Sequence, residues 1–117
     1  MLSSQEQALA LQAIERTHSC IDPNRIAVWG RSGGGSNTLN LMFRHPEIYK
    51  VGMAVAPVPD QRLYDSIYQE RFMGLPQDTA EGYKAGSPIN FAEGLEGCCW
   101  FTGRTMTTCT IRVPNSW

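Results

Sequence analysis

The chain has 117 residues, with ten lysines and arginines against eleven aspartates and glutamates, and a net charge of −1. No basic cluster is present, so neither nucleic acid nor an anionic membrane is expected as a partner. No apolar run reaches the roughly 20 residues of a transmembrane helix, and the N-terminus lacks the plan of a signal peptide. The cysteines have no metal-ligand spacing, so no metal site and no cofactor are expected.

The first predicted element is a helix over residues 4–17. Ser3 and Glu6 have the spacing of a capping box, and the apolar residues that follow recur at helical intervals. A turn at residues 22–24 then leads into a short apolar run, residues 26–29. That run lies between a turn and a glycine, which is typical of a buried parallel strand.

A glycine-rich segment, residues 30–35, separates this strand from a second predicted helix over residues 36–44. The apolar run at residues 51–56 predicts a second buried strand, which ends at Pro57. The order strand, glycine turn, helix, strand is a βαβ unit, whose strands are parallel and whose crossover is right-handed.

The remaining predicted elements are helical or irregular. Residues 62–71 are predicted as a third helix, in which Tyr64 and Tyr68 are four residues apart and so share a face. Residues 82–91 are predicted as a loop or short turns.

Residues 30–34, Gly-Arg-Ser-Gly-Gly, match the pattern Gly-x-Ser-x-Gly. In the nucleophile elbow of α/β-hydrolases this pattern puts a serine on a sharp strand-to-helix turn, with its hydroxyl exposed beyond the strand. Ser32 is therefore the predicted nucleophile. The N–H of Gly33 is the predicted oxyanion donor, and the positive end of the following helix favours the same negative charge.

The alternative for this motif is a glycine-rich turn that holds a phosphate. A P-loop requires a lysine after its last glycine, and a Rossmann fingerprint requires a different glycine spacing. The strand before the motif and the helix after it are the context that a nucleophile elbow needs. The expected fold class is a partial α/β-hydrolase fold, three-layered with a parallel sheet. The length supplies about half of that sheet, which we expect to be incomplete at its C-terminal side.

Longer segments around the motif resemble the catalytic domain of prolyl oligopeptidases, and most closely the dipeptidyl peptidase IV-like branch. That branch commonly has Asp-Pro-x-Arg-Ile and then Trp-Gly-x-Ser-x-Gly-Gly, which residues 22–26 and 29–35 match. The similarity extends over nearly all of residues 5–97. Its further segments are residues 44–46, 54–58, 64–76, 83 and 86–90.

The resemblance implies a serine peptidase that removes dipeptides from the N-termini of peptide substrates, after proline or alanine. It implies that Ser32 forms the acyl intermediate and that the Gly33 N–H is an oxyanion donor. The residues implied to bind the substrate are Val58, Tyr64, Tyr68 and Arg71. The first three would line an apolar pocket for the proline ring, and the arginine would order that wall or the substrate backbone. Ordinary core packing is the alternative for the two tyrosines.

Two departures from the branch leave the exact substrate preference open. The branch often has an aromatic residue where this chain has Gly33, and another near Gln61. The catalytic aspartate and histidine follow the serine in this fold, and no convincing counterpart follows Ser32. His45 lies about 13 residues, or roughly 20 Å of helix, beyond the serine, and His18 is equally unsuited as the base. We expect the propeller domain of the family to precede residue 1. The compartment stays open, a periplasmic or secreted parent protein being one expectation.

The last twenty residues differ from the family. Members continue with a buried strand and then His-Gly-Thr-x-Asp-Asp-Asn-Val-His, whereas this chain continues Cys-Cys-Trp-Phe-Thr-Gly. The reading frame can be shifted so that each codon begins at the third base of a codon in the frame of this sequence. In that shifted frame the codons of residues 98–101 must encode Leu-Leu-Val, and the later codons permit the family motif. We therefore predict that residues 1–97 are a piece of the catalytic domain and that residues 98–117 are a frame-shifted tail. We expect the tail not to form a central strand, which would uncover the edge beside residues 51–56. A divergent tail is the alternative.

Three functions follow from these observations. The first is a serine peptidase in the parent protein, with this chain an inactive truncated piece. The others are an esterase or acylaminoacyl hydrolase of the same fold, and a stub with no function of its own. The segment with Tyr64 and Tyr68 favours the peptidase, and the missing aspartate and histidine favour an inactive chain. The oligomeric state stays open.

Overall fold

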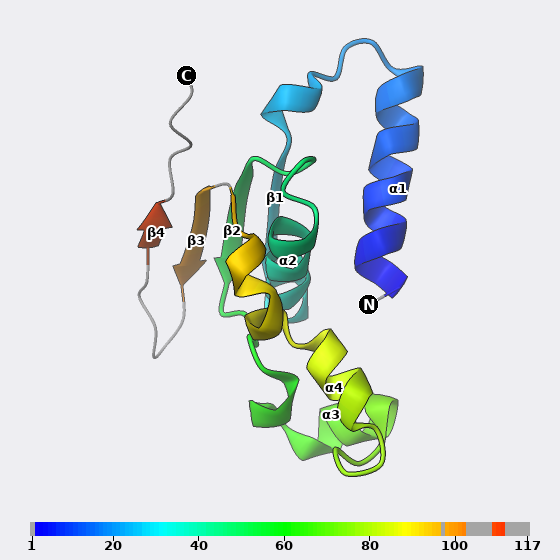
Figure 1. Cartoon of the computed structure of the whole chain (residues 1–117), viewed down its shortest axis with the longest axis vertical. Helices are drawn as coiled ribbons and strands as arrows, with labels where there is room; N and C mark the ends of the chain where they lie inside the picture. The colour runs from blue at the N-terminus through cyan, green and yellow to red at the C-terminus, as the bar shows by residue number, and fades with distance from the viewer. Residues whose placement is uncertain (1, 97, 103–108, 112–117) are drawn as a thin grey trace.

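The computed structural model describes residues 2–96, 98–102 and 109–111. Within them a four-stranded sheet has the order β1-β2-β3-β4 (Figure 1). Its strands are β1 (Ala27–Arg31), β2 (Val51–Val55), β3 (Cys98–Thr102) and β4 (Cys109–Ile111). The first three strands are parallel, and β4 is antiparallel to β3. This architecture is that of a partial α/β-hydrolase fold, as the sequence predicts.

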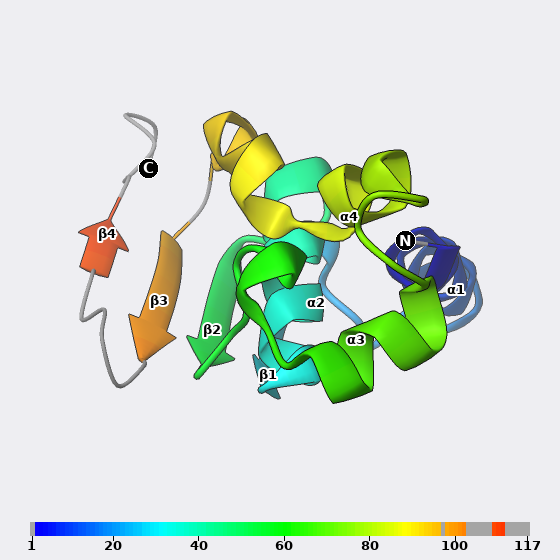
Figure 2. The ribbon, with the colours of Figure 1, turned by 90° about the horizontal axis from the view of Figure 1, so that it is seen from below.

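Helices lie beside the sheet and beyond one end of it. The α-helices are α1 (Leu2–Thr17), α2 (Gly33–Arg44), α3 (Ser66–Met73) and α4 (Ala80–Gly86). The 3-10 helices are η1 (Pro23–Arg25), η2 (Gln61–Leu63) and η3 (Pro88–Gly94). The helix α2 connects β1 to β2 and packs on both strands and on η3, while α1 packs against α2 (Figure 2). The helices α3 and α4 form a lobe beyond the carboxyl ends of β1 and β2 (Figure 1). No helix in the described ranges is long and apolar enough to cross a membrane.

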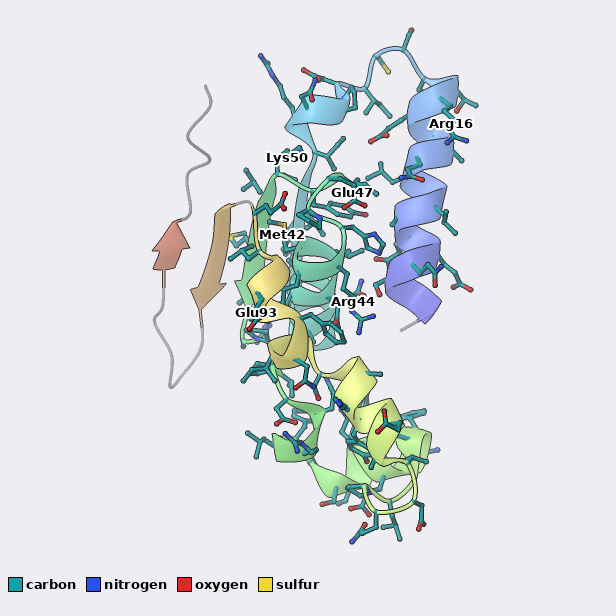
Figure 3. All side chains as sticks on the ribbon, in the orientation of Figure 1. Arg16, Met42, Arg44, Glu47, Lys50 and Glu93 are labelled. Atoms are coloured by element: carbon teal, nitrogen blue, oxygen red, sulfur yellow. The ribbon has the colours of Figure 1, made fainter. Side chains whose placement is uncertain are left out.

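The core lies between the sheet and the helices. In α2 every residue from Thr38 to Phe43 is buried, and Met42 is completely buried (Figure 3). The other core residues include Ala8, Leu39, Leu41, Phe43, Ile48, Tyr49, Ala54 and Leu95. Burying such apolar area stabilises the fold by roughly 25 cal/mol for each Å² removed from water. The rigid position of α2 on the sheet follows from this packing.

Only one face of β1 and β2 is covered, so the prediction of strands buried on both faces is wrong. Val28 packs against the core, whereas its neighbour Trp29 is 72% exposed. Met53, which pairs with Trp29, and Val51 are also exposed. Successive side chains of a strand point to opposite faces, so these exposed residues lie on the face opposite α2.

Several predicted boundaries differ from the structure. The first helix begins at Leu2, so Ser3 lies inside it and not at its N-cap. The second begins directly after the predicted nucleophile, at Gly33. The third begins at Ser66, because Asp65 caps it by accepting a hydrogen bond from the Ile67 N–H at 2.8 Å. Residues 82–91, predicted as a loop or short turns, lie in α4 and η3, with Ser87 between the two helices.

The expectation that residues 98–117 contribute no central strand is wrong. Residues 98–102 form β3, which lies between β2 and β4, and Val51 pairs with Cys98 at the start of the ladder. The edge of β2 is therefore covered. Parallel pairing uses backbone groups only, and the run Cys-Cys-Trp-Phe is apolar enough to occupy a strand. Residues 97, 103–108 and 112–117 lie outside the described ranges.

Candidate active site

Ser32 lies between the end of β1 and the start of α2, with φ 54° and ψ −120°. A positive φ is uncommon for a residue with a side chain, and such strain persists only where the surrounding structure holds it. The Ser32 N–H donates to the Val55 carbonyl at 2.8 Å, and the Ser32 carbonyl accepts from the Ser36 N–H at 3.0 Å. The turn is thus fixed on one side to β2 and on the other to α2.

Two glycines allow the strand and the helix to approach at this turn. A Cβ on Gly30 would overlap the carbonyl group of Gly34. A Cβ on Gly35 would lie 3.0 Å from the Val55 carbonyl oxygen, whereas one on Gly34 would meet nothing within 4 Å. Gly30 and Gly35 therefore carry the steric requirement. The pattern Gly-x-Ser-x-Gly identifies Gly30 as a required glycine. Its last glycine is Gly34, however, whereas the second position without room for a Cβ is Gly35, one residue later.

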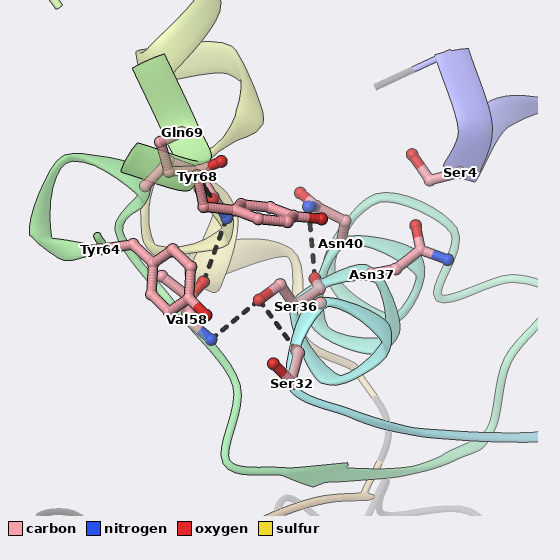
Figure 4. A pocket seen from close by; sticks show the side chains of 11 residues that line it. Ser4, Ser32, Ser36, Asn37, Asn40, Val58, Tyr64, Tyr68 and Gln69 are labelled. Carbon is pink, nitrogen blue, oxygen red and sulfur yellow. Dashed lines mark hydrogen bonds between the residues drawn. The ribbon is translucent and has the colours of Figure 1, made fainter. Parts of the chain in front are cut away.

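A cavity of about 300 Å³ opens beside Ser32. Among its lining residues are Ser32, Gly33, Val58, Tyr64 and Tyr68, so the structure brings together five of the six residues named from the sequence (Figure 4). The N–H groups of a helix's first turn have no intrahelical acceptor. Gly33 is the first residue of α2, so its N–H is one of these groups, and its role as an oxyanion donor stays a prediction.

Tyr64 and Tyr68 form the aromatic side of this cavity. Their rings meet edge to face, with centroids 5.8 Å apart and an interplanar angle of 88°. The helical-face argument for this pair is wrong, because Tyr64 precedes α3 and caps η2. The rings are nevertheless in contact, and they are 42% and 57% exposed. Both rings thus lie at the surface of the described residues, and their role in binding a substrate stays a prediction.

Arg71 does not line the cavity. Its side chain is exposed, and its guanidinium carbon lies 5.9 Å from the centroid of the Phe72 ring. Phe72 in turn contacts Tyr68, with ring centroids 5.2 Å apart. Arg71 is thus connected to the aromatic wall through one ring, and its ordering role stays a prediction.

Much of the cavity lining is polar. The polar lining residues that the sequence did not reveal are Ser4, Ser36, Asn37, Asn40 and Gln69, together with Gln61. The Ser36 hydroxyl donates to the Ser32 carbonyl at 3.3 Å and accepts from the Val58 N–H at 2.8 Å (Figure 4). A signal for Ser36 and Asn40 was available, since they follow Ser32 at intervals of four residues and so share a helix face.

A buried polar cluster supports the segment that carries this wall. The Asp60 carboxylate accepts from the Arg62 N–H and guanidinium and from the Ser87 hydroxyl. The Ser87 hydroxyl also accepts from the Gln61 N–H at 2.9 Å, and Ser87 is completely buried. Chiefly because of its hydrogen bond with the Arg62 side chain, the pKa of Asp60 is lowered from its ordinary value. The start of the wall is thus fixed to α4.

The two histidines of the chain do not serve Ser32. His45 caps the opposite end of α2 and contacts the Glu47 carboxylate at 3.4 Å. His18 follows α1 and forms a hydrogen bond with Thr17. Within the described ranges no group of three or more histidine, cysteine, aspartate or glutamate side chains is arranged to hold a metal ion.

A parallel strand that ends in a strained serine, followed at once by a helix, defines the nucleophile elbow of the α/β-hydrolase class. The sequence model of the prolyl oligopeptidase family matches residues 3–110 of this chain. The chain belongs to the prolyl oligopeptidase family, a family of serine-hydrolase peptidases.

Curated relatives and solved structures agree with this assignment. A protein of Metarhizium robertsii named "Probable dipeptidyl-aminopeptidase B" is 52% identical over 71 residues, which are 60% of this chain and 8% of that protein. One of the same name from Pyrenophora teres is 49% identical over 76 residues, 64% of this chain and 8% of the relative. The crystal structure of Porphyromonas gingivalis dipeptidyl peptidase 4 aligns with a TM-score of 0.79 and 43% identity, over 84% of this chain and 14% of that one. The chain thus spans about a tenth of such relatives.

Proposed function

We propose that this chain is part of a dipeptidyl peptidase IV-like serine peptidase, which releases dipeptides from peptide N-termini after proline or alanine. The observation that carries the proposal is that Ser32 lines a cavity whose other lining residues include two tyrosines in contact. A flat, rigid proline ring suits an aromatic wall beside the nucleophile. An esterase of the same fold has no need of such a wall, and the names of the relatives also favour the peptidase.

The proposed chemistry is acyl transfer. The Ser32 hydroxyl attacks the carbonyl carbon of the second substrate residue, losing its proton to a histidine base. The oxyanion then accepts a hydrogen bond from the Gly33 N–H, and the N-terminal end of α2 favours its charge. Collapse of the tetrahedral intermediate expels the amine of the following residue, and water releases the dipeptide.

We propose further that residues 98–117 are translated out of frame and that the chain alone is inactive. The frame shift is supported by the codons of residues 98–101, which must encode Leu-Leu-Val in the alternative frame. The inactivity is supported by the position of His45, which contacts Glu47 and not Ser32. A strand at residues 98–102 is compatible with this proposal, because the shifted codons still encode an apolar run. A triad serine without its base loses on the order of a millionfold in kcat.

The test compares two proteins on Gly-Pro-p-nitroanilide: this chain, and the full-length protein with its frame restored after residue 97. We expect turnover by the restored protein only, abolished by Ser32→Ala. Ser66→Ala, at an exposed serine outside the cavity, is the matched control and should leave turnover unchanged. Turnover that survives Ser32→Ala, or activity on p-nitrophenyl acetate without activity on the dipeptide anilide, would contradict the peptidase proposal.

A further inference from the structure

Ser87 connects two helices without lining the cavity beside Ser32. It lies between α4 and η3, its side chain is completely buried, and it is not among the described residues that line the cavity. Its hydroxyl donates to the Tyr83 carbonyl at 2.7 Å and accepts from the Gln61 N–H at 2.9 Å. Because Tyr83 lies in α4 and Gln61 begins η2, this hydroxyl joins two helices that are far apart in the sequence.

The segment that Ser87 holds carries residues that line the cavity. Val58 precedes Gln61 and Tyr64 follows it, and all three line the cavity. The side-chain amide of Gln61 also donates to the Val58 carbonyl at 3.3 Å. Tyr64 directly follows η2, so the position of Gln61 at the start of this helix determines where the tyrosine lies. A displacement of Gln61 would therefore move the tyrosine relative to the nucleophile.

The nucleophile turn is held by contacts that do not involve Ser87. Backbone hydrogen bonds join Ser32 to β2 and to the first turn of α2. The Ser36 hydroxyl accepts from the Val58 N–H at 2.8 Å, which keeps that end of the segment beside α2. Loss of the Ser87 hydroxyl should therefore release the other end of the segment, which carries Tyr64, and leave Ser32 in place.

We propose that Ser87 is a positioning residue for substrate recognition, which holds Tyr64 at the separation from Ser32 that a proline ring requires. It acts through the Gln61 N–H, and removing the hydroxyl leaves this donor without its acceptor, which is unfavourable. A misplacement of about 1 Å in a group that orients a substrate can cost on the order of a hundredfold in rate. That the oriented group is a proline ring rests on the proposed function. The contacts of Ser87 do not.

The kinetic test uses the frame-restored full-length protein and its Ser87→Ala variant. Each is quantified by fluorophosphonate labelling, so that only protein with a reactive serine is counted. Gly-Pro-p-nitroanilide brings a proline ring to the tyrosines, whereas p-nitrophenyl acetate reacts with Ser32 without such a ring. We expect kcat/KM to fall about tenfold on the anilide, chiefly through a higher KM, and to change less than about twofold on the acetate. Equal losses on the two substrates, or no loss on the anilide, would overturn the proposal.

Further variants separate the hydroxyl from general packing. Ser87→Thr keeps the hydroxyl and should keep the wild-type kcat/KM on the anilide, whereas Ser87→Cys replaces it by a weak acceptor and should show the selective loss. Ser66→Ala, at an exposed serine outside the cavity, is the matched control and should change neither rate. A loss in Ser87→Thr as large as in Ser87→Ala would overturn the proposal. Ser87→Cys decides the matter if Ser87→Ala does not fold.

Hydrogen exchange tests the same role without turnover. Mass spectrometry of the restored protein and of Ser87→Ala compares amide exchange in peptides that cover residues 58–64 and 30–36. We expect about tenfold faster exchange in the first peptide and no change in the second, because an amide that loses its hydrogen bond opens more readily. Selectively faster exchange in a protein that cleaves no dipeptide anilide contradicts the proposed function alone. Unchanged exchange in a protein that cleaves Gly-Pro-p-nitroanilide contradicts this inference alone.

Discussion

The Ser36 hydroxyl accepts a hydrogen bond from the Val58 N–H at 2.8 Å, and the same oxygen donates to the Ser32 carbonyl at 3.3 Å. One side chain thus joins the strained turn to the wall of the cavity. Ser32 and Val58 belong to segments 26 residues apart, and Ser36 fixes their separation.

Removing this hydroxyl should destabilise the fold measurably. Ser36→Ala leaves the Val58 N–H without its acceptor, and an unpaired buried donor costs about 1–3 kcal/mol. We expect a loss of that size in the free energy of unfolding from urea denaturation. Ser19→Ala, at an exposed position before β1, is the control and should change it by less than about 0.5 kcal/mol. Equal effects of the two variants would contradict the role given to Ser36.

The glycines of the motif should differ in their tolerance of a methyl group. Gly30→Ala forces a Cβ into the backbone of Gly34, and we expect at least about 3 kcal/mol of destabilisation or no folded protein. Gly34→Ala meets nothing within 4 Å and lies in α2, where alanine is favoured by about 0.5–1 kcal/mol. Thermal unfolding of the two variants tests this contrast. A Gly30→Ala protein as stable as Gly34→Ala would show that the close approach at this turn is not needed.

Stability should fall at acid pH through Asp60. The pKa of Asp60 is lowered, mainly by its hydrogen bond with the Arg62 side chain, so the folded protein binds this proton less readily than the unfolded chain. The resulting stabilisation is present above the ordinary carboxyl pKa and is lost as pH falls through the lowered one.

Asp60→Asn should therefore be less stable at neutral pH and lose less on acidification. Denaturation curves between pH 7 and pH 3 measure the slope. Asp78→Asn, at an exposed turn, removes the same formal charge and is the control. An Asp60→Asn slope identical to that of the wild type would exclude Asp60 as the source.

The nucleotide sequence around codon 97 should restore the family motif. In the alternative frame we expect an open reading frame through Leu-Leu-Val and Asp-Asp-Asn-Val-His, with a further histidine downstream. Sequencing of the genomic region and of the transcript checks this. A stop codon within a few codons in that frame would leave the divergent tail as the explanation.

The sequence predicts local features better than packing. The strand, the glycine turn and the helix around Ser32 follow from a short pattern, and the pairing of β1 with β2 follows from their apolar runs. The exposed face of Trp29 and Met53 does not, because an apolar run looks the same whether one face is covered or two. The strand at residues 98–102 does not follow from the sequence analysis, because a shifted reading frame says only how the segment arose. Whether the segment pairs with β2 depends on its backbone and on its apolar side chains.

The candidate site shows the same difference between residues in local motifs and residues brought together by packing. Ser32, Gly33 and the two tyrosines were found because they lie in recognisable motifs. Gln69 lines the cavity only because the fold brings α3 close to the turn at Ser32, and its polar side chain looks like a surface residue in the sequence. Asn40 differs, because its spacing after Ser32 puts it on the same face of α2.

Active-site labelling shows directly whether Ser32 is a nucleophile. The frame-restored full-length protein would be treated with a fluorophosphonate probe and digested, and the labelled peptide identified by mass spectrometry. The account predicts one modified residue, Ser32, in the frame-restored protein, and no labelling of the chain of 117 residues alone. Labelling of another serine, or of none in a protein that hydrolyses Gly-Pro-p-nitroanilide, would contradict it.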